Sequence, residues 1–251
     1  ALASVVVTRL RLKLRGLGFR PRPPAGVPPL ALRQLDVCWT AATGLGMVDV
    51  VQGACFSSRH LLLALRAGEP GRIALSLGFE AVNAGMAGAS KDRRTARLLA
   101  AAVGLAGQSP DPYFRAAVHL CRGDCDLLAG RFRAATAALA EAERVLRDSC
   151  TGVAWELDST RHWYFCCCCV LGEWAELSAR CPPLLQDARD RGDLFAEMNY
   201  LTGPMAHVRL AADDPGRAWD ELHATAARWS QQGFHLQHIW VLESSALISL
   251  Y

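Results

Sequence analysis

The sequence has no long apolar run, although 51% of its 251 residues are hydrophobic. Arg66, Glu80 or His207 interrupts each of its most apolar stretches, so none reaches the roughly 18 residues that a membrane-spanning helix needs. The N-terminus also lacks the basic, apolar and small-residue order of a signal peptide. We therefore expect a cytoplasmic protein without a membrane span.

Signatures of catalysis are missing too. The sequence contains no HExxH, GxSxG, HRD or DFG segment. The glycine-rich stretch "GLGMVDVVQG" at 44–53 lacks the Lys-Ser/Thr of a phosphate loop and the GxGxxG order, so we interpret it as a turn between helices. We predict no catalytic residue, no cofactor and no metal in this chain.

Acidic residues are absent from the first 35 positions. This stretch carries seven of the 27 basic residues, namely Arg9, Arg11, Lys13, Arg15, Arg20, Arg22 and Arg33. Such a basic end can contact nucleic acid or an anionic surface. No nucleic-acid motif accompanies the charge, so we favour a solvated helix and a proline-rich linker over residues 1–30 and expect no nucleic-acid partner.

Strand-like alternation is rare. Its one short example, "LRLKLR" at 10–15, fits an amphipathic helix equally well. From about residue 30, helical stretches alternate with Gly, Pro and Asp clusters of the kind that end helices and begin new ones. The clusters lie at 68–70, 88–90, 109–112, 130, 149–152, 172, 191–193, 213–216 and 232–233. This pattern predicts an all-α fold.

The breaks recur at a nearly fixed spacing. Gly88, Gly130, Gly172 and Asp214 follow one another at intervals of 42 residues, and Gly152, Gly192 and Gly233 fall between them at intervals of 40 and 41. A helical hairpin repeated at a fixed period indicates an α-solenoid of antiparallel helical hairpins. The period is longer than the 34 residues of a tetratricopeptide repeat (TPR) and the consensus of that repeat is absent, so the array is described as TPR-like.

We assign this solenoid to residues 31–251. The first hairpin covers 31–67, and the last begins at 234 and is incomplete. Because the chain does not begin with Met and ends on an apolar run, we expect it to be truncated at both ends relative to a parent protein.

Two proline sites conflict with regular helices. Pro204 lies inside the helix expected at 194–211, where an interior proline costs about 3 kcal/mol and kinks the helix. Cys181-Pro182-Pro183 interrupts 173–190, so we expect a short helix or turn to end near 180 and a new helix to begin near Pro182.

The sequence has ten cysteines, four of them consecutive at 166–169, and no export signal, which suggests a reducing compartment. Four consecutive helical residues point about 100° apart and cannot converge on one metal; only Cys166 and Cys169, or His162 and Cys166, share a face. When the repeats are aligned on their turns, Cys169 occupies the same position as Leu127 and Ala211, which are both apolar. We therefore predict that Cys169 packs in the core, with a metal or redox site as the alternative.

Two other pairs have helical spacing. Cys121 and Cys125 are four residues apart with His119 nearby, and His235 and His238 are three apart. Each pair can in principle bind a metal. We favour core packing for the cysteines, and capping or packing at the start of the last helix for the histidines.

A surface for partners is the stronger functional prediction, because the first helix of each stacked hairpin commonly lines the concave side. The candidate partner-binding residues on these helices are polar: Arg161, His162, Asn199, His207, His235 and His238.

Several segments carry a family resemblance: "LLLALRAGEP" at 61–70, "TGVAWELDSTR" at 151–161, "RLAADDP" at 209–215 and "RWSQQGFHLQH" at 228–238, with "LDVCW" at 35–39 and "GLGMVD" at 44–49. Together they resemble the C-terminal TPR-like region of large bacterial serine/threonine protein kinases of the myxobacterial and planctomycete type. The resemblance implies a parent kinase whose ATP and Mg sites precede Ala1, so no catalytic residue is carried over. The four cysteines, Pro204 and the double proline depart from the usual helix formers of such arrays.

We therefore expect a non-catalytic protein-interaction or regulatory region of a signalling protein. Its partner would be another protein or the kinase or ATPase domain of its own parent. The alternatives are the helical-repeat module of an ATPase-type transcriptional regulator and, less favoured, a Cys/His metal-binding protein. The sequence does not specify the oligomeric state.

Overall fold

A computed structural model describes residues 2–88 and 92–251, and every regular element in this part of the chain is helical. The predicted all-α class is therefore confirmed. The chain divides into two compact units, Ala1–Ala129 and Gly130–Tyr251. Within the described residues, no helix combines the length and the apolar character of a membrane span.

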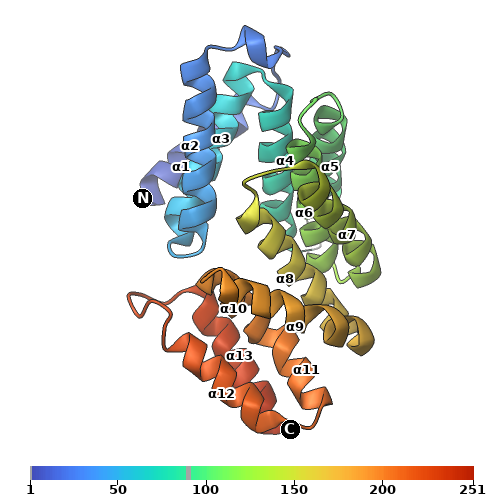
Figure 1. Cartoon of the computed structure of the whole chain (residues 1–251). Coiled ribbons are helices and arrows are strands. Elements are labelled where there is room, and N and C mark those ends of the chain that lie inside the picture. Colours follow the sequence, from blue (N-terminus) through green and yellow to red (C-terminus); the bar gives the residue numbers. More distant parts are fainter. Residues whose placement is uncertain (1, 89–91) are drawn as a thin grey trace. The chain divides into compact units, whose positions relative to one another are not determined.

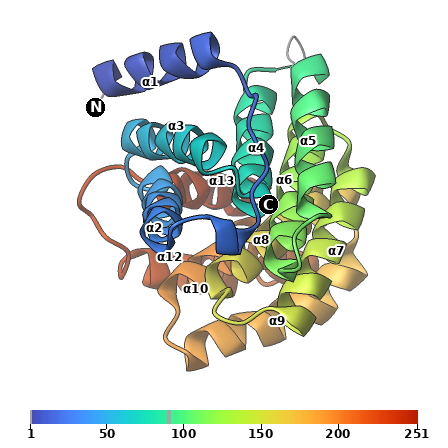
Figure 2. The same cartoon turned by 90° about the horizontal axis from the view of Figure 1, so that it is seen from above.

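The first unit, blue to green in Figure 1, begins with the helix that contains the "LRLKLR" stretch, so the helical interpretation of that stretch holds. Its elements are α1 (Leu2–Arg15), the short η1 (Pro24–Gly26), α2 (Pro29–Gly46), α3 (Val50–Ala67), α4 (Pro70–Gly85), α5 (Asp92–Ala106) and α6 (Pro112–Leu128). Helix α1 packs along α3, and α4 packs beside α5 (Figure 2). The glycine-rich stretch at 44–53 provides the turn between α2 and α3, as predicted.

Buried leucine, isoleucine and alanine side chains form the core of the first unit, among them Leu35, Leu65 and Ile73. Helix α4 approaches α6 closely at Gly71, where a Cβ atom would lie only 2.4 Å from the ring of Phe114. A side chain at this position would collide with the buried Phe114 ring unless that ring moved, so the packing of this ring against α4 relies on a glycine there.

The second unit, yellow-green to red in Figure 1, contains the "RHWYFCCCC" segment. Its elements are α7 (Phe132–Ser149), α8 (Ala154–Leu171), α9 (Trp174–Asp190), α10 (Leu194–Tyr200), the irregular turn η3 (Leu201–Met205), α11 (Ala206–Ala211), α12 (Pro215–Ala226) and α13 (Leu236–Leu250). Side chains such as Phe165, Leu177 and Leu222 form its core.

Most helix boundaries fall at the predicted breaks, and the local chemistry explains why. Asp111, Asp193 and Asp214 each accept a hydrogen bond from a backbone N–H in the first turn of the following helix, as N-cap residues do. Gly172 ends α8 in the left-handed conformation, with φ of 71°, which glycine adopts at little cost. Of the break at 88–90, Ala89 and Ser90 lie outside the described residues.

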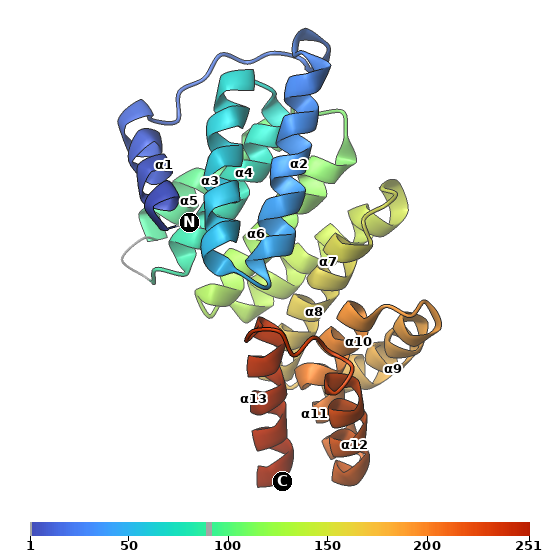
Figure 3. The ribbon, with the colours of Figure 1, turned by 90° about the vertical axis from the view of Figure 1, so that its left-hand side faces the viewer.

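In the hairpin series predicted from the sequence, α8, the α10–α11 segment and α13 are the first helices, and within the second unit they are neighbours. Helix α8 packs against α10 and η3, and η3 and α11 pack against α13. The second helices α9 and α12 lie against α10 and α11, and α12 also packs beside α13 (Figure 3). Residues separated by about 40 positions in the sequence are thereby brought side by side.

The prediction of a helix break at Cys181-Pro182-Pro183 is wrong. Helix α9 runs without interruption from Trp174 to Asp190 and contains both prolines. Its buried face explains the continuity, because Leu177, Cys181, Leu185 and Ala188 are 0–2% exposed at helical spacing on both sides of the prolines. Burial of this face outweighs the cost of the missing N–H groups.

The register predicted for the four cysteines is shifted by about one residue. Cys167 and Cys168 are 0% and 1% exposed, whereas Cys169 is partly buried against the core and the next residue, Val170, is exposed. The aligned residue Ala211 is exposed as well. The thiols thus pack in and around the core, but Cys168 occupies the central position that we assigned to Cys169.

Candidate binding pocket

A break in the helix at Pro204 creates the candidate site. Helix α10 ends at Tyr200, and Thr202 (ψ 100°) and Gly203 (φ 93°, ψ −79°) leave helical geometry before α11 begins at Ala206. Proline has no backbone N–H to donate, and its ring clashes with the preceding turn. The predicted kink at Pro204 is therefore confirmed, and it exposes carbonyl groups that a continuous helix would satisfy.

Side chains satisfy these carbonyl groups. Thr202 Oγ1 donates to the Met198 carbonyl at 2.7 Å, and His207 Nδ1 lies 2.8 Å from the Gly203 carbonyl. His162 Nδ1, on α8, lies 2.9 Å from the Asn199 carbonyl. Because a carbonyl only accepts, Nδ1 carries a proton in both histidines, and in the neutral form of each ring Nε2 has a lone pair.

A pocket of about 300 Å³ opens beside this break. Residues of three successive first helices line it: His162, Trp163 and Cys166 from α8; Thr202, Gly203 and His207 from η3 and α11; and Trp240, Glu243, Ser244 and Leu247 from α13. We call this site the aromatic pocket.

Rings form much of its wall. Trp163 and Trp240 meet edge to face, with centroids 5.9 Å apart and planes at 89°. His162 lies against Trp240 with centroids 4.5 Å apart, and Trp174 stacks on His207 at 5.6 Å. Packed rings of this kind fix one another's orientation, so the wall is largely preformed.

The fixed charge in the pocket is negative. Glu243 is exposed at its rim, and in the described part of the chain no ion pair involves this carboxylate. Burial lowers the pKa of His162 to about 4, so its ring is neutral at pH 7. The lining contains no lysine or arginine. The aromatic pocket thus offers lone pairs, π faces and one negative charge.

The predicted residues His162 and His207 meet in this pocket. His162 is only 3% exposed, and its Nε2 lies 3.6 Å from Cys166 Sγ, so its ring mainly supports the wall. His207 is partly exposed. Asn199 is 1% exposed and contributes its backbone carbonyl to the break rather than a side chain to the surface.

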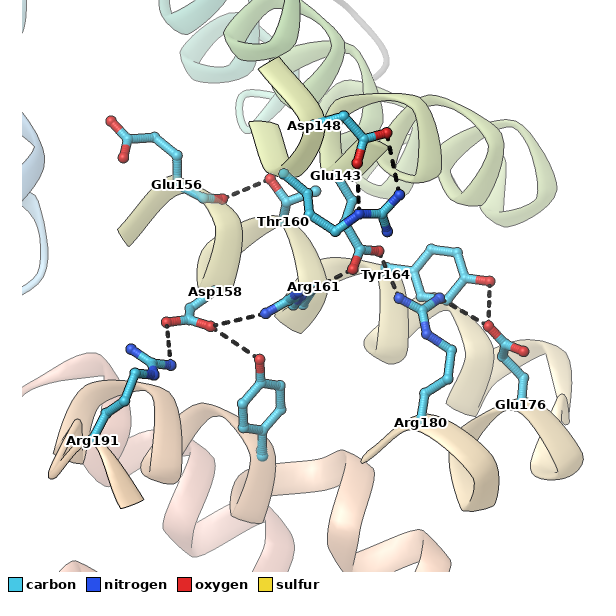
Figure 4. Close-up of polar contacts among 12 residues, drawn as sticks. Glu143, Asp148, Glu156, Asp158, Thr160, Arg161, Tyr164, Glu176, Arg180 and Arg191 are labelled. Carbon is cyan, nitrogen blue, oxygen red and sulfur yellow. Dashed lines mark hydrogen bonds and ion pairs between the residues drawn. The ribbon is translucent and has the colours of Figure 1, made fainter. Parts of the chain in front are cut away.

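Arg161 lies in an interior charge network (Figure 4). Its guanidinium bonds to Glu143 at 2.9 Å and lies 3.7 Å from Asp158, and its side chain is only 12% exposed. Arg180 also donates to Glu143, at 2.6 Å. Burial acts to raise the pKa of Glu143, but the hydrogen bonds from Arg180 and Arg161 outweigh it and lower the pKa. The network joins α7, α8 and α9.

Asp158 extends the network to the next hairpin. It accepts a hydrogen bond from Tyr200 at 3.0 Å. It also accepts one from Arg191 at 3.5 Å (Figure 4). Asp158 is 2% exposed and Tyr200 is 1% exposed. A buried carboxylate needs such partners; burial nevertheless raises the pKa of Asp158, so the contacts link helices α8 and α10 without fully offsetting the cost of burying its charge.

His235 and His238 form a capping box at the start of α13, which confirms the capping interpretation. The His235 N–H donates to His238 Nδ1 at 2.9 Å, and the Trp229 indole donates to His235 Nδ1 at 3.1 Å. His238 also lines a second pocket, of about 240 Å³, with Trp229, Phe234 and Gln237. His238 therefore lies in a different pocket from His162 and His207.

The sequence interpretation did not identify Trp240, Glu243 and Ser244 as site residues. The usable signal is that Trp163 on α8 and Trp240 on α13 are tryptophans on first helices of different hairpins. Their meeting depends on the kinked α10–α11 segment between them, whose geometry the sequence does not specify.

The cysteines lie in an environment that suits packing. Burial raises the pKa of Cys168 to about 11 and that of Cys169 to about 12, so both remain thiols at neutral pH. Metal ligation and nucleophilic chemistry require the thiolate form. In the described residues, no three His, Cys, Asp or Glu side chains gather as metal ligands would.

Comparison of the chain with protein-family models, with curated proteins and with solved structures gives no match in any of the three.

Proposed function

We propose that this chain is a non-catalytic, TPR-like helical-repeat module that binds a partner protein. In this proposal the hairpins stack as an α-solenoid, and the partner lies across the first helices of the second unit. The resemblance to the C-terminal regions of bacterial kinases implies that the chain is part of a larger kinase. The partner would then be another protein or the kinase domain of the parent protein.

One observation carries the proposal: three successive first helices contribute to the aromatic pocket. Adjacent first helices are what a stacked array of hairpins produces, and their shared face is where such arrays bind extended partners. A preformed pocket with aromatic walls and a few polar groups also has the composition of a recognition site.

The proposal is tested by selecting peptides from a random display library on the full chain. We expect enriched peptides to lose binding to the variant Glu243→Trp, which places a bulky ring over the pocket rim. The matched control is Asp220→Trp, because Asp220 is also exposed but lies on α12, outside the pocket lining. Circular dichroism checks that both variants remain folded.

Two results would refute it. The first is that no peptide is enriched on the folded chain. The second is that enriched peptides bind Glu243→Trp and Asp220→Trp equally well, which would place binding away from the pocket.

A further inference from the structure

We infer that the aromatic pocket binds the guanidinium group of an arginine side chain on the partner. This inference rests on the proposed function and specifies the chemistry of the partner at one position.

The charge of the pocket favours a cation. Glu243 is the only Asp or Glu in its lining, and neither lysine nor arginine contributes to the lining. The faces of Trp163 and Trp240 attract a cation through their ring quadrupoles. An anionic group would meet a carboxylate and π faces here without a compensating positive charge.

The hydrogen-bonding groups favour a cation that has N–H donors. His207 Nδ1–H donates to the Gly203 carbonyl at 2.8 Å, so Nε2 is the remaining nitrogen of this partly exposed ring, and in the neutral ring it accepts a hydrogen bond. Thr202 Oγ1 donates to Met198 and keeps acceptor capacity. A guanidinium presents five N–H donors, whereas a quaternary ammonium presents none.

Shape also favours the planar cation. Trp163 and Trp240 stand at 89° to each other, so a flat group that stacks on one ring and lies beside the other turns its own edge toward the face of that second ring. Guanidinium groups stack on aromatic faces and donate in their own plane to a carboxylate. The volume of about 300 Å³ lies at the lower limit of small-ligand pockets and suits a single long side chain.

The test uses three synthetic peptides, Ac-Gly-Ala-Xaa-Ala-Gly-NH2, in which Xaa is arginine, lysine or citrulline. Citrulline has nearly the shape of arginine but no charge. Each peptide is titrated into the full chain to millimolar concentration, and the tryptophan indole N–H resonances are followed by NMR. We expect the arginine peptide to bind about tenfold more tightly than the citrulline peptide, and more tightly than the lysine peptide.

The matched variants are Glu243→Gln and Asp220→Asn, which each neutralise one exposed carboxylate. We expect Glu243→Gln to weaken binding of the arginine peptide by about three- to tenfold, and Asp220→Asn to leave binding unchanged. Equal binding of the arginine and citrulline peptides, equal binding of arginine and lysine, or equal loss in the two variants would each overturn the inference.

The display selection separates the two proposals. Selected peptides that compete at the pocket but contain no arginine would refute the guanidinium inference while the binding function stands. Failure to select any peptide would refute the function itself.

Discussion

At the scale of single residues, the most consequential group is His162, because burial keeps its imidazole neutral even though its Nδ1 bonds to a carbonyl. Its Nδ1 bonds to the Asn199 carbonyl at 2.9 Å, and its Nε2 faces Cys166 Sγ at 3.6 Å. Burial lowers its pKa from an ordinary value near 6.5 to about 4. In the unfolded chain the same ring takes up a proton at a higher pH, so acid favours unfolding.

The sign follows from proton binding. Between pH 6.5 and 4 the unfolded state binds more protons at this residue than the folded state, so stability is full above 6.5 and falls as the pH drops toward 4. From pH 7 to pH 5 the contribution of His162 to the free energy of unfolding should fall by roughly 2 kcal/mol.

The variant His162→Asn isolates this effect, because its amide can still donate to the Asn199 carbonyl but does not titrate. Urea unfolding at pH 7 and pH 5 should show a stability difference between wild type and variant that shrinks by roughly 2 kcal/mol at the lower pH. A constant difference would mean that His162 is protonated or accessible in the folded state. His60, whose pKa burial also lowers to about 4, affects both proteins equally.

The residue scale is also where the sequence is least informative. Repeat alignment identifies the helix that carries the four cysteines but not which thiol is central, since the most buried thiols, Cys167 and Cys168, lie two and one residues before the predicted core position. Likewise, the helix of Arg161 and His162 was assigned correctly. Their partners, Glu143 and the Asn199 carbonyl, come from other helices.

At the scale of the element, the break at 201–205 depends on Gly203 as well as on Pro204. Gly203 has φ of 93°, and a Cβ atom there would meet nothing within 4 Å. The cost of a side chain would therefore be conformational and not steric crowding. We expect Gly203→Ala to lower the free energy of unfolding by about 1–3 kcal/mol.

Gly104→Ala is the matched control, because Gly104 is exposed within α5 and also has nothing near its Cβ position. In ordinary helical conformation, alanine should stabilise the chain by up to about 1 kcal/mol. Opposite signs in urea unfolding are the expected result. Stabilisation by Gly203→Ala would show that the segment can adopt a regular helix despite Pro204.

The two proline sites show what limits prediction of elements. Local rules predict a disruption at both Pro182 and Pro204, yet only Pro204 breaks its helix. On α9, the residues flanking the prolines bury a continuous face that includes Cys181 and Leu185. At 201–205, the neighbouring Gly203 permits a non-helical conformation, and His162 and His207 satisfy carbonyl groups at the break. Tertiary contacts therefore decide between two similar local signals.

At the scale of the whole molecule, helix order and boundaries follow closely from the sequence, because Gly, Pro and Asp act locally at turns. The repeat spacing predicts one series of hairpins over 31–251, and this stays a prediction. The spacing gives no sign of the two compact units, Ala1–Ala129 and Gly130–Tyr251. Packing between distant segments determines that division, and the spacing of turns does not report it.

This division predicts that residues 130–251 fold without the first unit. Their core cluster and the network of Glu143, Arg161 and Asp158 lie entirely within the second unit. The separate fragment should therefore show helical circular dichroism and a cooperative thermal transition.

The informative control is a shorter fragment, 154–251, which lacks α7 and therefore Glu143. Its Arg161 and Arg180 lose a shared carboxylate, although each keeps a second one, Asp158 and Glu176 respectively, so we expect 154–251 to melt at a lower temperature than 130–251. If 154–251 melts as cooperatively and at the same temperature as 130–251, α7 is not part of the folding unit; if neither fragment melts cooperatively, the second unit requires the first.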